Sequence, residues 1–183
     1  KNGITNKNKL YIRSSKADIN KTLSGINTSV IENGTTVLTG LTLNSFYGLR
    51  IEDKEISLNK PDVSKVIAVY EAVSNNGVTL DSLTFQGGLG LDSASVLGEK
   101  IIGQTSGAIG QIVTRSSPDE IEFVYLNSNT FVADETVKFE ESNISGTCIL
   151  VTKGSYIDKT QEYNLDKGQR EQYYDYSRIV RKS

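Results

Sequence analysis

The chain of 183 residues contains no histidine, no tryptophan and no methionine, and it has a single cysteine. Without histidine, the Ser-His and Cys-His arrangements of the common nucleophilic enzymes are excluded. Zinc sites built from histidine and cysteine are nearly excluded too, because only one such ligand is present. Carboxylates are therefore the main groups left for acid–base or metal chemistry, and we predict no metal site and no cofactor.

The lone cysteine cannot form an internal disulfide. Cys148 lies in an apolar run, and we expect it to be a buried structural thiol. The 20 basic and 22 acidic residues nearly balance and no long basic run occurs, so nucleic acid is not expected as a partner. No apolar run approaches the roughly 20 residues that cross a bilayer, so we predict no membrane span. Because the chain begins with Lys1 rather than methionine, we expect it to be a segment of a longer protein.

Apolar residues are mostly β-branched or aromatic, and they come in short runs separated by glycine, asparagine and aspartate. This pattern predicts an all-β protein with many turns. Asn33-Gly34 and Asn76-Gly77 supply the positive φ angles of two-residue hairpin loops, so each should join paired antiparallel strands. The predicted strands cover residues 9–13, 29–32, 36–38, 46–52, 55–58, 65–72, 78–85, 100–102, 109–114, 120–125, 136–139, 147–152, 161–165 and 176–181.

A weak internal repeat relates residues 98–113 to residues 134–151. Each copy runs from a glutamate through a short strand and a turn to a second apolar strand, which is the length of one hairpin. We expect the two glutamates, Glu99 and Glu135, to cap turn amides rather than to act in catalysis. The turns are predicted at Ser106-Gly107 and Ser145-Gly146.

The repeat suggests a small module of five strands over residues 96–153. If this module is self-contained, the strands before and after it would have exposed edges unless they pair with each other. We therefore predict an antiparallel β-sandwich-like host domain made of residues 1–94 plus 154–183, with a small β-barrel module inserted at 96–153. A linear division into two domains remains the alternative.

Paired carboxylates for glycoside hydrolysis stay open as an alternative chemistry. Most of the acidic residues lie beside turns or alternate outward along strands, which is the ordinary solvated position. We therefore predict that the chain is not an enzyme. The carboxylates that could converge are Glu71, Asp119, Glu122, Asp134, Glu135 and Glu140.

The C-terminal segment is rich in tyrosine, and five of the nine tyrosines follow residue 155. Asp166 and Gly168 are predicted to set a tight turn. The aromatic residues of this segment either complete the core or, with interleaved arginines, contact a neighbouring subunit, and both interpretations can hold for different residues. The interface candidates are Arg170, Tyr173, Tyr174, Tyr176 and Arg178.

Residues 165–179, LDKGQREQYYDYSRI, resemble a signature "LDNGQRDNFYDxxRI" of virion structural proteins of tailed phages. The signature is most familiar from baseplate and tail-fibre-associated proteins of contractile-tailed phages that infect marine cyanobacteria. Residues 98–110 are similar to a "GExIxGxTSGAxG" β module of these proteins, and residues 55–58 with 62–71 resemble the strand before the signature. The chain departs from the signature at Lys167, Glu171 and Gln172, but it keeps the glycine turn and the aromatic pair.

The resemblance implies a non-enzymatic structural segment of a phage tail, baseplate or fibre that acts through packing against its neighbours. Its expected partners are other virion proteins or copies of itself, and its expected location is the virion after synthesis in the host cytoplasm. The alternative is a module of a tail appendage that binds host-surface polysaccharide. Only 8% of residues are aromatic and tryptophan is absent, which counts against stacking on sugar rings.

Overall fold

The computed structural model of the chain describes residues 16–19, 29–32, 35–38, 53–74, 76–169 and 175–182. Strands dominate this part of the chain, and every described strand pair is antiparallel, which confirms the predicted all-β class. The chain divides into two compact units, one of residues 1–16 and 74–156 and the other of residues 17–73 and 157–183. No helix among the described residues is long and apolar enough to cross a membrane.

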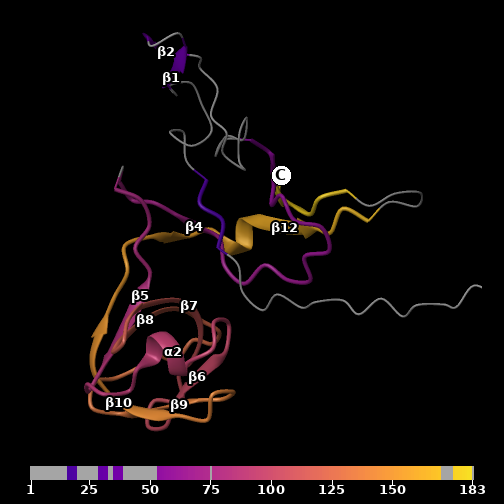
Figure 1. Ribbon diagram of the computed structural model, residues 1–183. Coiled ribbons are helices and arrows are strands. Elements are labelled where there is room, and N and C mark those ends of the chain that lie inside the picture. Colours follow the sequence, from indigo (N-terminus) through magenta and orange to yellow (C-terminus); the bar gives the residue numbers. More distant parts are fainter. Residues whose placement is uncertain are drawn as a thin grey trace, which may run out of the picture. The chain divides into compact units, whose positions relative to one another are not determined.

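Six strands of the first unit form a closed ring in the hydrogen-bonded order β10-β5-β8-β7-β6-β9. Figure 1 shows these strands wound around a common centre. Every strand of the ring thus has a hydrogen-bonded neighbour on both sides, which closes the sheet on itself. The ring strands are β5 (Asp81–Phe85), β6 (Lys100–Gly103), β7 (Ile109–Ser117), β8 (Glu120–Tyr125), β9 (Thr136–Phe139) and β10 (Ser145–Thr152), and the short helix α2 (Leu91–Ala94) precedes β6.

Alternate residues of the ring strands form one apolar core, as the period of two along a strand requires. In β9, for example, Val137 and Phe139 are fully buried, while Thr136 and Lys138, which alternate with them, are exposed. The Phe123 and Phe131 rings meet edge to face with centroids 5.1 Å apart. The core consists of Leu83, Phe85, Leu91, Ile101, Ala108, Ile112, Ile121, Phe123, Phe131, Val137, Phe139 and Cys148.

The ring begins earlier in the chain than the module predicted at 96–153. Strand β5 hydrogen-bonds β10 on one side and β8 on the other, so the ring has six strands where the sequence pattern indicated five. The hairpin predicted at Asn76-Gly77 does not form. Strand β4 (Tyr70–Glu71) before this turn pairs with β11 (Ile157–Asp158), and both edges of β5 after it are already occupied.

The described residues of the second unit form three small sheets. Strands β1 (Ser29–Glu32) and β2 (Thr35–Leu38) pair with Glu32 opposite Thr35, which confirms the hairpin predicted at Asn33-Gly34. A three-stranded sheet has the order β12-β13-β3, and β11 with β4 forms a separate pair. The buried residues of the three-stranded sheet include Ile56 and Ile179, which lie opposite each other on neighbouring strands. The strands are β3 (Glu55–Ser57), β12 (Tyr163–Asp166) and β13 (Arg178–Arg181), with a 3-10 turn η1 (Thr160–Glu162) before β12.

Two strand predictions differ from this arrangement. The strand expected over 65–72 is reduced to the two residues of β4, because only these residues meet a partner strand. Strand β11 was not predicted, since its two exposed residues carry no alternating pattern. The strands predicted at 9–13 and 46–52 lie outside the described residues.

Candidate functional site

Two buried glutamates are the most distinctive polar groups of the ring. Glu99 is 0% exposed and immediately precedes β6, whereas Glu135 is 3% exposed and immediately precedes β9. The residue before each glutamate has a positive φ, 80° at Gly98 and 63° at Asp134. The same backbone bend therefore turns each carboxylate inward just before its strand begins.

The Glu99 carboxylate accepts hydrogen bonds from two segments. Its Oε1 accepts from the backbone N–H of Val96 at 2.6 Å. Its Oε2 accepts from the backbone N–H groups of Glu141 and Ser142, both at 3.0 Å. The Ser142 hydroxyl adds a contact of 3.0 Å to Oε1. Glu99 thus caps the turn that joins β9 to β10.

The Glu135 carboxylate makes the equivalent contacts. Its Oε1 accepts from the backbone N–H of Val132 at 2.8 Å. Its Oε2 accepts from the backbone N–H groups of Thr105 at 3.1 Å and Ser106 at 3.0 Å. The Ser106 hydroxyl donates to Oε1 at 2.9 Å. Glu135 thus caps the turn that joins β6 to β7, and we refer to these two contact sets as the glutamate clasps.

The clasps are related by a constant offset of 36 residues, which links Glu99 to Glu135, Val96 to Val132 and Ser106 to Ser142. Each glutamate holds the turn of the other repeat. In the antiparallel pair of β6 and β9, Ile102 lies opposite Lys138, which is again 36 positions further along the chain. An approximate twofold axis therefore relates the two repeats.

This alignment corrects one predicted turn. Gly107, with φ 64°, corresponds to Asn143, with φ 56°, so the second turn is at Ser142-Asn143. Ser145-Gly146, which was predicted to be that turn, instead starts β10. Asparagine tolerates the left-handed conformation better than most residues with a side chain, and so it can replace glycine here.

The repeat extends to β5 and β8, where corresponding residues are 38 rather than 36 positions apart, an extension that the sequence pattern did not predict. Leu83 and Phe85 are buried in β5 as Ile121 and Phe123 are in β8, and the two strands pair with Leu83 opposite Ile121. The register shifts that follow Ile112 in β7 and Cys148 in β10 are also 36 residues apart. The ring therefore consists of two three-stranded repeats, β5-β6-β7 and β8-β9-β10. Only two apolar positions in each strand carry the β5–β8 similarity.

The carboxyl groups of both clasps are surrounded by amide and hydroxyl donors. The ion pairs resolved in the described part of the chain involve Lys159 and Arg178 of the second unit. Burial alone would raise the pKa of Glu135, but hydrogen bonds from Ser106, Val132 and Thr105 outweigh it and hold this pKa below its ordinary value. Glu135 is therefore an ionised structural acceptor at neutral pH. This agrees with the capping role predicted for both glutamates, since all their resolved contacts are to turn and loop donors.

A third buried carboxylate, Asp81, lies at the start of β5. It accepts hydrogen bonds from the backbone N–H of Gly154 at 2.8 Å and from the Tyr156 hydroxyl. The neighbouring residues Thr79 and Ser155 form an antiparallel bridge. Asp81 therefore ties the two ends of the 74–156 stretch together, a role that nothing in the local sequence indicated.

Cys148 is fully buried in β10, as predicted, and it carries a free thiol. Its Sγ donates to the carbonyl oxygen of Leu150 at 3.4 Å. Burial raises the pKa of this thiol, so it stays protonated at neutral pH. Cys148 therefore serves as a core residue of the ring.

In the C-terminal segment, Asp166 accepts a hydrogen bond from the backbone N–H of Gly168 at 2.9 Å. Gly168 has φ 70°, and a Cβ at this position would lie 2.7 Å from the carbonyl oxygen of Tyr176. This is the geometry of an aspartate that shapes a turn at a glycine. The fully buried Ser177 stabilises the turn, because its hydroxyl donates to the carbonyl oxygen of Lys167 at 3.1 Å.

The interface candidates fall into three groups. Tyr176 is 54% exposed. Arg178 contacts carboxylates of its own unit, with 2.9 Å from Nη1 to Glu55 Oε2 and 3.0 Å from Nη2 to Asp175 Oδ2. Its Nε is 3.3 Å from Asp166 Oδ2 but is not aligned for a hydrogen bond. Arg170, Tyr173 and Tyr174 lie outside the described residues.

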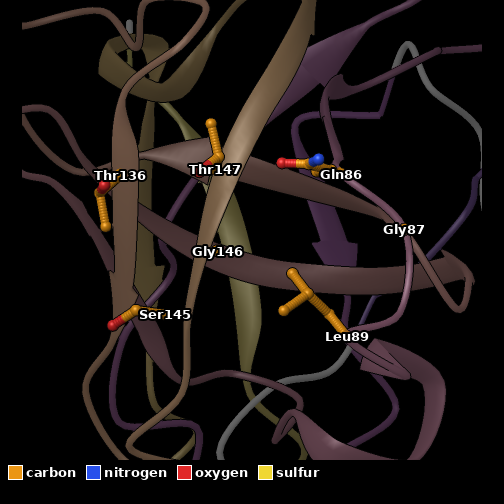
Figure 2. A pocket seen from close by; sticks show the side chains of 7 residues that line it. All are labelled: Gln86, Gly87, Leu89, Thr136, Ser145, Gly146 and Thr147. Carbon is orange, nitrogen blue, oxygen red and sulfur yellow. The ribbon is translucent and has the colours of Figure 1, made fainter.

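A shallow hollow of about 270 Å³ lies on the ring beside Gly146. Figure 2 shows Gln86 and Leu89 on one side of it, and Thr136, Ser145 and Thr147 on the strands opposite. Leu89 packs directly over Gly146, where a Cβ would overlap its methyl group. The hollow therefore offers hydroxyl and amide groups around one leucine.

The described residues contain no cluster of three or more histidine, cysteine or acidic side chains that could hold a metal ion. Of the carboxylates considered for glycoside hydrolysis, Glu135 caps a turn, and Asp119 accepts a hydrogen bond from the backbone N–H of Gly88 at 3.1 Å. Comparison of the chain with protein-family models, with curated proteins and with solved structures finds no match.

Proposed function

We propose that this chain is a non-enzymatic structural segment of a phage virion, from the tail, baseplate or fibre, and that it acts by packing against neighbouring virion proteins. The sequence support is the resemblance of residues 165–179 and 98–110 to such proteins. The structural observation that carries the proposal is the pair of glutamate clasps. Their carboxylates are the most deeply buried acidic groups of the ring, and all their resolved contacts hold turns in place.

A rigid module of this kind suits a scaffold. Closure of the ring gives each of its strands a hydrogen-bonded neighbour on both sides, which disfavours accidental pairing with other chains. The clasps fix the two hairpin turns by hydrogen bonds to charged groups, which are stronger than bonds between neutral groups. Contacts with neighbours are then left to the second unit, where Tyr176 is exposed and where Arg170, Tyr173 and Tyr174 follow the Asp166–Gly168 turn in sequence.

The proposal is tested by quantitative mass spectrometry of purified phage particles whose genome encodes the chain. Peptides of this chain should copurify with the tail at a constant ratio to known tail proteins. The infected-cell supernatant, cleared of particles, is the matched control. Peptides found only in that supernatant would contradict a structural role in the virion.

A second candidate function, binding of host-surface polysaccharide, is favoured by the hollow beside Gly146. The hydroxyls of Thr136, Ser145 and Thr147 and the amide of Gln86 line it, and such groups hydrogen-bond sugar hydroxyls. A glycan array probed with the folded chain decides between the two functions. Reproducible micromolar binding that is lost in Thr147→Val would favour the polysaccharide function, and an array without binding would reject it.

A further inference from the structure

The segment from Lys65 to Val69 is the most strand-like sequence that the described part of the structure leaves outside a sheet. It reads Lys-Val-Ile-Ala-Val, which is rich in β-branched residues, and it leads directly into β4. Its backbone is neither helical nor left-handed. The segment therefore has the composition of a strand but lacks a strand partner among the described residues.

Within this segment, only Val69 forms backbone hydrogen bonds to other described residues. At Val69, the N–H donates to Thr160 Oγ1 at 2.9 Å and the carbonyl accepts from Lys159 N at 2.8 Å. The backbone groups of the four preceding residues, Lys65 to Ala68, have no hydrogen-bond partner in the described part of the chain. The side chains from Val66 to Ala68 are only half-buried. An unpaired row of N–H and C=O groups is a template for a strand from another chain.

The two backbone edges of this segment differ in their hydrogen bonds. Since Val69 directs its backbone groups toward Lys159 and Thr160, and successive residues of a strand alternate, Ala68 directs its own groups toward the opposite edge. Glu71, two residues beyond Val69, pairs with Ile157 of β11 on the same side as Val69. The edge opposite β11 is therefore the one that offers the backbone groups of Ala68.

We infer that this edge pairs with the same segment of a second copy of the chain, antiparallel across a twofold axis centred on Ala68. In this register Lys65 of each copy lies opposite Glu71 of the other, so two identical ion pairs flank the centre. Both side chains are exposed, and Glu71 has only a loose contact of 4.0 Å with Lys159 within its own chain. Ile67 and Val69 then lie opposite each other and bring their β-branched side chains together.

This charge match selects a second copy as the partner. A twofold axis makes any contact reciprocal, so a strand that carries Lys65 and Glu71 at equal distances from its centre is complementary to itself. The inference rests on the proposed packing function and adds the partner. Sedimentation velocity over a range of micromolar concentrations should show a monomer–dimer equilibrium of the full chain.

Charge variants test the register. Lys65→Glu should weaken the dimer about tenfold, because it replaces two attractive cross-strand pairs by two repulsive ones. The double variant Lys65→Glu with Glu71→Lys should restore the dimer, because the pairs are exchanged and not lost. Lys153→Glu, an exposed substitution of the same charge change in the other unit, is the matched control and should leave the dimer unchanged.

A backbone variant tests the pairing itself. Ala68→Pro removes one N–H at the centre of the segment, a group that has no partner within the described residues of the monomer. The variant should keep the circular dichroism spectrum of the wild-type chain and abolish dimerisation. A chain that stays monomeric at every concentration overturns the inference, and so does an association that Lys65→Glu and Ala68→Pro leave unchanged. Detection of the chain in particles would still support the packing function in that case, so the two proposals fail separately.

Discussion

Replacement of Glu135 by glutamine tests how much one glutamate clasp stabilises the ring. The substitution keeps the shape of the side chain but removes its charge and converts one oxygen into an NH₂ group. If the amide oxygen stays near Thr105 and Ser106, the NH₂ group faces the backbone N–H of Val132, which now bonds Oε1 at 2.8 Å. The opposite rotamer leaves two N–H groups, those of Thr105 and Ser106, without an acceptor.

Even the better rotamer loses one hydrogen bond to a charged acceptor and places its NH₂ group against the backbone N–H of Val132. Bonds to charged groups contribute about 1.5–3 kcal/mol each, and the remaining bonds to Ser106 and Thr105 weaken with the loss of charge. We expect Glu135→Gln to lower the free energy of unfolding by about 3 kcal/mol. For a unit of this size, about 4–8 °C of melting temperature corresponds to each kcal/mol, so the shift should be roughly 12–24 °C.

Urea unfolding followed by far-ultraviolet circular dichroism measures the change, and amide hydrogen exchange of ring peptides assigns it to the first unit. Glu99→Gln should have an effect of similar size, because its contacts are equivalent. Glu140→Gln is the matched control, since Glu140 directly follows β9 and its side chain is exposed. Equal stability of Glu135→Gln, Glu99→Gln and Glu140→Gln would show that the glutamate clasps do not stabilise the ring.

The remaining predictions concern pH and three glycines. The pKa of Glu135 lies below its ordinary 4.5, so its contribution is complete above that pH and is lost as pH falls through the lower folded-state value. Urea midpoints of wild type and Glu135→Gln should thus converge only in acid, and convergence near neutrality would be inconsistent with the clasp. Gly110→Ala would place a Cβ 2.7 Å from the Phe123 ring and should cost about 1–3 kcal/mol in urea unfolding. Gly87→Ala, whose Cβ would lie 3.5 Å from the nearest atom, should be nearly neutral, and equal midpoints for the two variants would contradict this. Gly168→Ala should cost at least about 1–2 kcal/mol for the left-handed conformation and speed hydrogen exchange in β12 and β13; unchanged exchange would exclude that strain.

The glutamate caps could be predicted from the sequence because their signal is local. Glu99 and Glu135 open matching repeats, and each is followed by a short strand and a turn residue that tolerates positive φ. The second turn was misplaced by three residues, because Ser145-Gly146 has the better turn composition whereas Ser142-Asn143 has the right spacing. Local composition favoured a turn that the 36-residue offset excludes.

Other features depend on partners that are far away in sequence. Asp81 receives its hydrogen bonds from Gly154 and Tyr156, which are 73 and 75 residues away, so no local pattern indicates that it is buried. The run from Lys65 to Val69 has high strand propensity, but propensity does not provide a neighbouring strand. Where the paired neighbour exists, at Tyr70 and Glu71, the strand forms.

The central claim, that the chain is a packing element of a virion, is tested most directly by cryo-electron microscopy of the particle that its genome encodes. The six-stranded ring, with its two pseudo-symmetric hairpins, should be traceable in density of the tail, baseplate or fibre. The second unit should contact neighbouring subunits there. A particle map whose tail and baseplate density is fully assigned to other proteins would contradict the claim.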